Sequence, residues 1–221
     1  AAHGAEVHGV DLSKPIDNET FERIERAYNK YAVLLFRDQK INEEQHLGFS
    51  RQFGKLEVHV LDQYLHPNHP EILVVSNIKE GDRHIGIYDA GRYWHTDLSY
   101  MKRPSRGSLL YAIEVPHDDE GNPLGDTLYT SSSAAYDALP KKMRKLIDGL
   151  NAEFSLANRH AKLIADGDTE AVLSDKHQDK VPPVVHKVVR SHPITGRKSI
   201  YVNEGQTAKI LGVPDDEAQD L

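Results

Sequence analysis

The sequence lacks cysteine altogether, so it can form neither a disulfide framework nor a thiolate metal site. Any bound metal must therefore be held by imidazole and carboxylate groups, which favours iron, manganese, cobalt or zinc over iron–sulfur chemistry. The chain has 13 histidines from which such ligands can be drawn. A chain without thiols also fits a reducing compartment, and we expect a cytoplasmic protein.

Long apolar runs and clusters of positive charge are absent too. The longest apolar stretch, residues 32–36, has the length of a buried strand and falls far short of the ~18 residues that a membrane helix needs. The net charge is −7 without a basic stripe, whereas phosphate binding needs clustered lysine and arginine. We therefore expect no membrane and no nucleic-acid partner.

The residues that are present predict one domain over residues 1–221, because 38% hydrophobic content over this length is enough for one core. Strands are predicted at residues 7–12, 32–36, 72–76, 93–100 and 108–115. Short strands separated by long segments favour a sandwich or jelly roll over a βαβ fold.

Helices are predicted from Glu19 onward with Asn18 as the cap, over residues 42–54, and over residues 139–150. Residues 166–181 are polar and aperiodic, which indicates a loop or lid. Residues 184–190 and 199–203 predict a hairpin.

The two ends of the sequence carry an expectation of their own. The chain starts at Ala1 without a methionine and stops at Leu221, inside an acidic stretch that follows Pro214. Such a stretch predicts the first turn of a helix. We expect the domain to be incomplete at its C-terminus.

The most informative segment is Tyr-Trp-His-Thr-Asp-Leu-Ser-Tyr at residues 93–100. Alternate residues of a strand share a face, so His95 and Asp97 would project side by side. An imidazole and a carboxylate in this arrangement suit two adjacent positions on one metal ion, with a third ligand from a distant strand. A solvated polar face is the competing interpretation, and a zinc site of the same nitrogen and oxygen ligands is another.

The order of several motifs resembles the taurine dioxygenase family. Residues 94–97, Trp-His-Thr-Asp, are similar to that family's iron-binding segment, and residues 125–129, Gly-Asp-Thr-Leu-Tyr, are similar to its Gly-Asp-Thr-Leu-Trp. Further matching pieces lie at residues 9–12, 36–39, 53–54, 188–193, 196–198 and 201–205. Each piece is weak alone, and the resemblance rests on their shared order along nearly the whole chain.

This resemblance implies a mainly β fold with flanking helices, a double-stranded β-helix or jelly roll with iron inside one end. It implies iron(II) held by His95, Asp97 and a further histidine beyond Leu221, where an arginine that clamps 2-oxoglutarate is also expected. Thr127 corresponds to the threonine that hydrogen-bonds the 2-oxoglutarate carboxylate; without the family match it would be taken as a turn residue. His186 and His192 are the alternative third ligands within the chain.

The activity implied is oxidative decarboxylation of 2-oxoglutarate by O2, coupled to hydroxylation of a small organic anion. Sulfonates, sulfate esters and aryloxyalkanoates are the substrate types of the family. We expect a homo-oligomer that acts on such a small molecule. Two other classes stay open: a zinc-dependent hydrolase and a non-catalytic jelly-roll binding module. Gly125-Asp126-Thr127 has no evident use in either.

The resemblance also names residues of the substrate pocket. His59 matches a pocket histidine, and Tyr201 matches an aromatic position that lines the substrate; a surface histidine and a core tyrosine are the alternatives. Asp62, Gly91 and His160 stand where the taurine-specific enzyme has Tyr, Asn and Phe, which argues against taurine as the substrate.

Charge sharpens this argument. The carboxylate of Asp62 would repel a sulfonate unless a nearby cation offsets it. Arg83, Arg92 and Arg159 are basic residues that could meet an anion, or they are ordinary surface charges.

Overall fold

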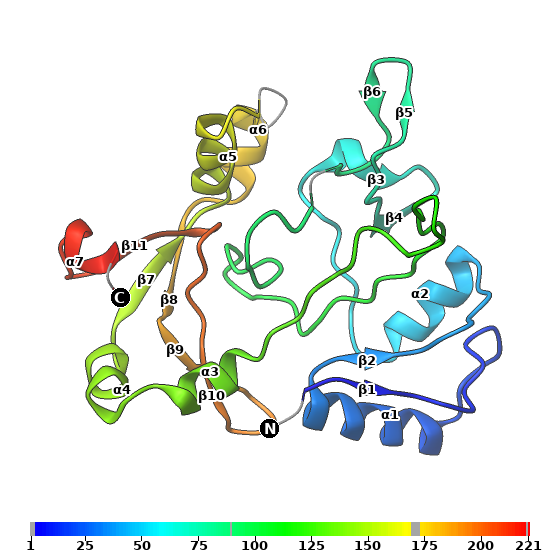
Figure 1. The fold of residues 1–221 in the computed structure, drawn as a ribbon, viewed down its shortest axis with the longest axis horizontal. Helices are drawn as coiled ribbons and strands as arrows, with labels where there is room; N and C mark the ends of the chain where they lie inside the picture. The colour runs from blue at the N-terminus through cyan, green and yellow to red at the C-terminus, as the bar shows by residue number, and fades with distance from the viewer. Residues whose placement is uncertain (1–2, 89, 169–172, 220) are drawn as a thin grey trace. The chain divides into compact units, whose positions relative to one another are not determined.

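The computed structural model describes residues 3–88, 90–168, 173–219 and 221. The chain divides into two compact units: unit 1 comprises Ala1–Leu56 with Arg106–Ser131, and unit 2 comprises Glu57–Ser105 with Ser132–Leu221. Figure 1 shows their helices and strands. All residues predicted to bind metal or primary substrate lie in unit 2, whereas Thr127 lies in unit 1.

Unit 1 contains β1 (Ala5–Glu6), α1 (Asn18–Tyr31), β2 (Leu34–Leu35) and α2 (Glu43–Arg51). The two strands pair in parallel. Helix α1 begins one residue earlier than predicted, because Asp17 rather than Asn18 accepts the backbone N–H of Thr20, at 2.8 Å. Helix α2 begins after Asn42, as predicted, through a capping box with Gln45.

The core of unit 1 gathers around Leu12, Ile24 and Phe49, with Phe49 edge-on to Phe53 at 5.4 Å between ring centroids. Residues 106–131 form no strand within the described part of the unit, so the strand predicted at 108–115 is wrong. Most of their large apolar side chains are exposed, and Ile113 is 88% exposed. Strand-like composition did not produce a strand because no neighbouring strand pairs with this segment.

Unit 2 holds the remaining elements. They are η1 (Asp62–Tyr64), β3 (Leu65–His66), β4 (His69–Leu73), β5 (Lys79–Glu80), β6 (Arg83–His84), α3 (Ser132–Ala138), α4 (Lys141–Ile147), β7 (Asn151–Phe154), α5 (Leu156–Ala165), α6 (Asp175–Lys180), β8 (Val184–Lys187), β9 (Val189–Ser191), β10 (Lys198–Ile200), β11 (Thr207–Ile210) and α7 (Asp215–Gln219). Within the described residues, no helix is both long and apolar enough to cross a membrane.

The centre of unit 2 is a three-stranded antiparallel sheet in which β7 lies between β8 and β11 (Figure 1). On β7, Ala152 and Phe154 are fully buried, while Asn151 is exposed and Glu153 partly so, as expected for a strand with one face on the core. Strands β9 and β10 form the predicted hairpin, with Ser191 opposite Lys198. Strand β8, which was predicted to belong to that hairpin, pairs with β7 instead.

Three further predictions of local structure are wrong in whole or in part. Residues 7–12 are not a strand, since β1 ends at Glu6. Residues 93–100 form turns rather than a strand: the backbone N–H of Met101 donates to the Leu98 carbonyl at 2.9 Å. Residues 166–181 are not wholly a loop, because Ser174 caps α6 within them; residues 169–172 of that prediction lie outside the described residues.

Candidate metal centre

The two predicted metal ligands lie side by side, although in a turn and not on a strand. His95 Nε2 is 3.1 Å from Asp97 Oδ1, and His95 Nδ1 donates to the Tyr93 carbonyl at 2.8 Å. Leu98 follows with a positive φ of 54°, a conformation that costs about 1 kcal/mol or more for a non-glycine residue. The turn, instead of strand alternation, brings the imidazole and the carboxylate together.

This pair needs a positive charge between its two atoms. A carbonyl can only accept, so Nδ1 carries the proton and a neutral His95 presents an Nε2 lone pair to the carboxylate. In this structure the carboxylate of Asp97 raises the pKa of His95 above its ordinary value, against the opposing effect of burial. The contact therefore favours a positive charge at the place that a cation would take.

The residues present fit one side of a metal site. Two ligands at a right angle, with bonds of about 2.1 Å, are about 3 Å apart, and the measured separation is 3.1 Å. The bond from Nδ1 to a backbone carbonyl is also the usual support of a metal-binding histidine. Among the residues that the structure describes, no three or more ligand side chains gather at one point.

The alternative third ligands are held elsewhere. His186 Nε2 contacts the Met101 carbonyl at 2.9 Å. His192 Nδ1 accepts the backbone N–H groups of Ile194 and Thr195 in the turn after β9, each at 3.2 Å. Both rings are thus engaged with backbone, and neither joins His95 and Asp97 in a ligand group within the described residues.

A buried hydrogen-bond network anchors the segment that carries this pair. Ser99 is fully buried; its hydroxyl donates to Gln206 Oε1 and accepts from Asn203 Nδ2 at 3.2 Å. The backbone carbonyl of Gln206 accepts the backbone N–H of Ser155, the N-cap of α5, at 2.9 Å. Residues far apart in sequence therefore fix the position of the turn. The motif at 201–205 signalled this region, but nothing in the sequence linked it to Ser99.

A hollow opens beside His95. It is shallow and open to solvent, and its lining consists of Gly91, Arg92, Tyr93, His95, Arg159, Gly205 and Gln206. Two of the residues selected from the sequence, Gly91 and His95, thus border one space. Arg92 and Arg159, which were candidates for meeting an anion, border it too.

His59 lies in a more buried setting. The backbone N–H of Leu61 donates to Nδ1 at 3.2 Å, so a neutral ring carries its proton on Nε2, which is 3.0 Å from the Tyr100 hydroxyl. Burial lowers the pKa of His59 to about 4, while the charges of Asp97 and Arg159 act on it in opposite directions. Tyr100 was not selected from the sequence, because no motif pairs it with His59.

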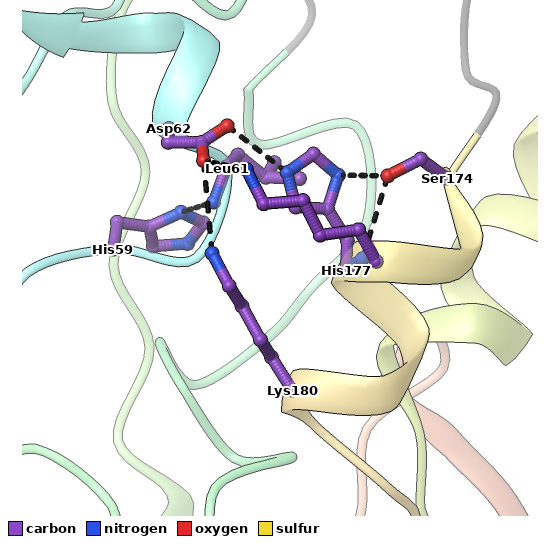
Figure 2. A network of polar contacts seen from close by, with 7 residues as sticks. His59, Leu61, Asp62, Ser174, His177 and Lys180 are labelled. Atoms are coloured by element: carbon purple, nitrogen blue, oxygen red, sulfur yellow. Dashed lines mark hydrogen bonds and ion pairs between the residues drawn. The ribbon is translucent and has the colours of Figure 1, made fainter.

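Asp62 points toward helix α6 (Figure 2). Its carboxylate contacts Lys176 Nζ at 3.0 Å, His177 Nε2 at 3.1 Å and Lys180 Nζ at 3.6 Å. The hydrogen bonds from Lys176 and His177 hold the pKa of Asp62 well below its usual range. The lysines offset the negative charge, so the expected repulsion of a sulfonate by an unbalanced Asp62 does not apply.

His160 and Tyr201 lie in the core of unit 2, each 8% exposed. The Tyr201 ring packs 5.4 Å from Phe154 and 5.6 Å from His186 between centroids, with the guanidinium of Arg190 at 4.4 Å from its ring. Neither residue lines the hollow beside His95. Their contact with a substrate stays a prediction.

Thr127 lies in unit 1, in the exposed stretch after Gly125. Gly125 has a φ of +76°, which favours glycine at this turn. The structure describes this residue within its own unit only, so its predicted role toward 2-oxoglutarate stays a prediction.

Comparison with known proteins gives consistent matches. The family described as "Taurine catabolism dioxygenase TauD, TfdA family" matches residues 1–221. Pentalenolactone F synthase of Streptomyces arenae is 32% identical over 99% of this chain and 74% of that protein. The alpha-ketoglutarate-dependent 2,4-dichlorophenoxyacetate dioxygenase of Cupriavidus pinatubonensis is 30% identical over 95% of this chain and 73% of its own length.

Solved structures agree with these sequence matches. The crystal structure of AAD-2 in complex with Mn(II) and N-oxalylglycine superimposes with a TM-score of 0.68 at 27% identity, covering 98% of this chain and 72% of that one. The likeness thus extends from sequence to fold over almost the whole chain.

Proposed function

The chain belongs to the TauD/TfdA family of α-ketoglutarate-dependent dioxygenases, and on that premise we propose that His95 and Asp97 hold its iron(II) and that its primary substrate is a small organic anion. Enzymes of this family use iron(II), 2-oxoglutarate and O2. When bound, the metal supplies the oxidative chemistry that joins decarboxylation of 2-oxoglutarate to hydroxylation of the substrate. Nothing in the comparisons supports a zinc hydrolase or a non-catalytic binding module.

One observation carries the assignment of the ligands: the 3.1 Å contact between His95 Nε2 and Asp97 Oδ1. The Tyr93 carbonyl orients the imidazole by accepting from Nδ1, so that Nε2 is directed at the metal position. A facial triad needs three protein ligands. The third is proposed to be a histidine beyond Leu221, with a 2-oxoglutarate-clamping arginine in the same part of the protein.

Thr127 is proposed to donate its hydroxyl to the 2-oxoglutarate carboxylate. Substituting Thr127→Val keeps the shape of the side chain and removes the donor. A hydrogen bond to a charged group contributes about 1.5–3 kcal/mol, so 2-oxoglutarate should bind about ten to a hundred times more weakly. An unaltered affinity would contradict this role.

The substrate is proposed to be an aryloxyalkanoate, sulfate ester or sulfonate other than taurine. Support comes from the similarity to a dioxygenase that acts on 2,4-dichlorophenoxyacetate, and from Gly91 and His160, which differ from the taurine-specific pattern. A panel of such acids, scored by succinate release above the background without primary substrate, tests this. Taurine as the best member of the panel would contradict it.

The proposed architecture around this site is one double-stranded β-helix domain that continues beyond Leu221. The antiparallel sheet of β11, β7 and β8 supports it. The proposal extends to a cytoplasmic homo-oligomer acting on a small molecule, which light scattering and cell fractionation would test.

The decisive experiment measures metal binding to the full natural chain by calorimetry. With Mn(II) and N-oxalylglycine, the pair present in the related AAD-2 structure, the wild type should bind about one metal per chain. His95→Ala should abolish this binding, whereas His117→Ala, at an exposed histidine of unit 1, should leave it intact. Equal binding by both variants would remove His95 from the metal centre.

A further inference from the structure

The side chain of Arg159 is held against the candidate site by helix α5. Leu156, His160 and Leu163 are buried, and Arg159 shares their side of the helix because residues three and four apart lie on one face. The N-terminus of the helix is fixed by Ser155, whose hydroxyl accepts the backbone N–H of Asn158 at 3.2 Å. Arg159 is half-buried and lines the hollow together with His95.

The positive charge of Arg159 also acts on two groups outside the lining of the hollow. It acts to lower the pKa of His59 and that of Tyr100, although burial has the larger effect on both. Together with its place in the lining beside His95, this puts the guanidinium close to the candidate site.

This charge has no counter-ion in the described part of the chain. The acids around the hollow bind other partners: Asp168 pairs with Arg92 at 3.8 Å, Asp166 accepts from the Tyr93 hydroxyl, and Asp97 pairs with His95. None of the lining residues is acidic. A half-buried cation is costly unless something balances it, so the hollow is suited to an incoming anion.

We propose that Arg159 receives the anionic group of the primary substrate and selects acids over their neutral analogues. A guanidinium presents forked N–H donors that match the paired oxygens of a carboxylate, sulfate or sulfonate. The inference rests on the proposed function and deepens it, since it assigns the recognition of charge to one residue next to His95. Arg92 borders the same hollow, but its charge already faces Asp168.

The test compares an acid with its neutral counterpart on the full natural enzyme. Phenoxyacetate and phenoxyacetamide serve as probes, and their binding to the enzyme with Mn(II) and N-oxalylglycine is measured by calorimetry. The wild type should prefer the acid, and Arg159→Gln should weaken binding of the acid about ten- to a hundredfold while changing the amide little. Arg159→Lys should recover part of the preference. Arg197→Gln, at an exposed arginine after the β9 turn, is the charge-matched control and should bind like the wild type.

Succinate release from 2-oxoglutarate without primary substrate distinguishes a failure of the proposed function from a failure of the inference about Arg159. If the wild type releases none, the proposed function fails whatever Arg159 does. If the wild type turns over 2-oxoglutarate but binds acid and amide equally, or if Arg159→Gln keeps the preference, the inference about Arg159 is overturned. A variant whose only defect is weaker binding of N-oxalylglycine overturns it too, because Arg159 would then hold the co-substrate.

Discussion

His59 and His95 belong to the same unit, yet their surroundings act on them in opposite directions. His59 lies among buried groups, donates to Tyr100 and has its pKa lowered to about 4 by burial. His95 lies 3.1 Å from the carboxylate of Asp97, which raises its pKa. The same side chain is thus kept neutral at one position and drawn toward a positive partner at the other.

The difference divides the site into a neutral side and a charged side. The hydrogen-bond partners of His59, the Leu61 N–H and the Tyr100 hydroxyl, are uncharged. Beside His95 lie two charges of opposite sign, Asp97 and Arg159, which in the proposed function meet a metal ion and an anion. The histidine that has a carboxylate partner and a backbone-held Nδ1 is the one that fits a metal ligand.

The largest expected effect comes from removing the carboxylate that creates the charged side. Asp97→Asn should weaken Mn(II) binding by about a hundredfold or more, since a ligand is lost. In the metal-free protein the pKa of His95 should fall toward its ordinary value, because Asp97 is the main cause of its increase. Calorimetry and an NMR titration of His95 measure the two effects. Asp137→Asn, at an exposed position of α3, is the control, and equal metal affinity in both variants would refute the assignment.

The next largest effect is expected from removing the Ser99 hydroxyl, which anchors the turn that carries His95 and Asp97. Ser99→Ala leaves the buried Gln206 and the partly buried Asn203 short of a hydrogen-bond partner, which should cost about 1–3 kcal/mol in the free energy of unfolding. Urea unfolding measures it, with the exposed Ser191→Ala as the control. If both variants are equally stable, the buried network does not fix the turn that carries His95 and Asp97.

The comparison of the two histidines becomes sharpest in the pH dependence of stability. The pKa of His59 is about 4 in the folded protein and ordinarily 6.5, so protons bind the unfolded state first as the pH falls. Stability should therefore decrease below about pH 6.5, by about 2 kcal/mol at pH 5 relative to a group that does not titrate. His95 has a raised pKa, so its contribution is present at low pH and is lost as the pH rises through the folded value.

Two variants of the metal-free protein test these signs. Relative to His59→Gln, the wild type should lose free energy of unfolding between pH 7 and pH 5. Relative to His95→Gln, it should gain over the same interval. Urea unfolding at both pH values measures these changes in the free energy of unfolding. Changes of the same sign relative to the two variants would show that the folded protein does not shift the two histidine pKa values in opposite directions.

The sequence could predict the chemistry of the site better than its geometry. The family motif at 93–100 placed an imidazole next to a carboxylate correctly, but strand alternation was the wrong reason, since a turn with Leu98 at positive φ brings them together. The strand predicted at 184–190 does form, as β8 and β9, because β7 pairs with the first and β10 with the second. The strand predicted at 108–115 does not form, because pairing depends on distant residues that a local pattern does not contain.

The smallest expected effect concerns Gly91, at the rim of the charged side. Its φ is +86°, and an added Cβ would meet nothing within 4 Å, so the cost of a substitution is set by the backbone alone. Alanine in this left-handed region costs about 1 kcal/mol, whereas asparagine tolerates it better. Gly91→Asn should therefore unfold within about 1 °C of the wild type, and Gly91→Ala about 2–4 °C lower. Thermal unfolding of the two variants measures this difference. If the alanine and asparagine variants unfold at the same temperature, the left-handed backbone at residue 91 is not what makes glycine favourable at this position.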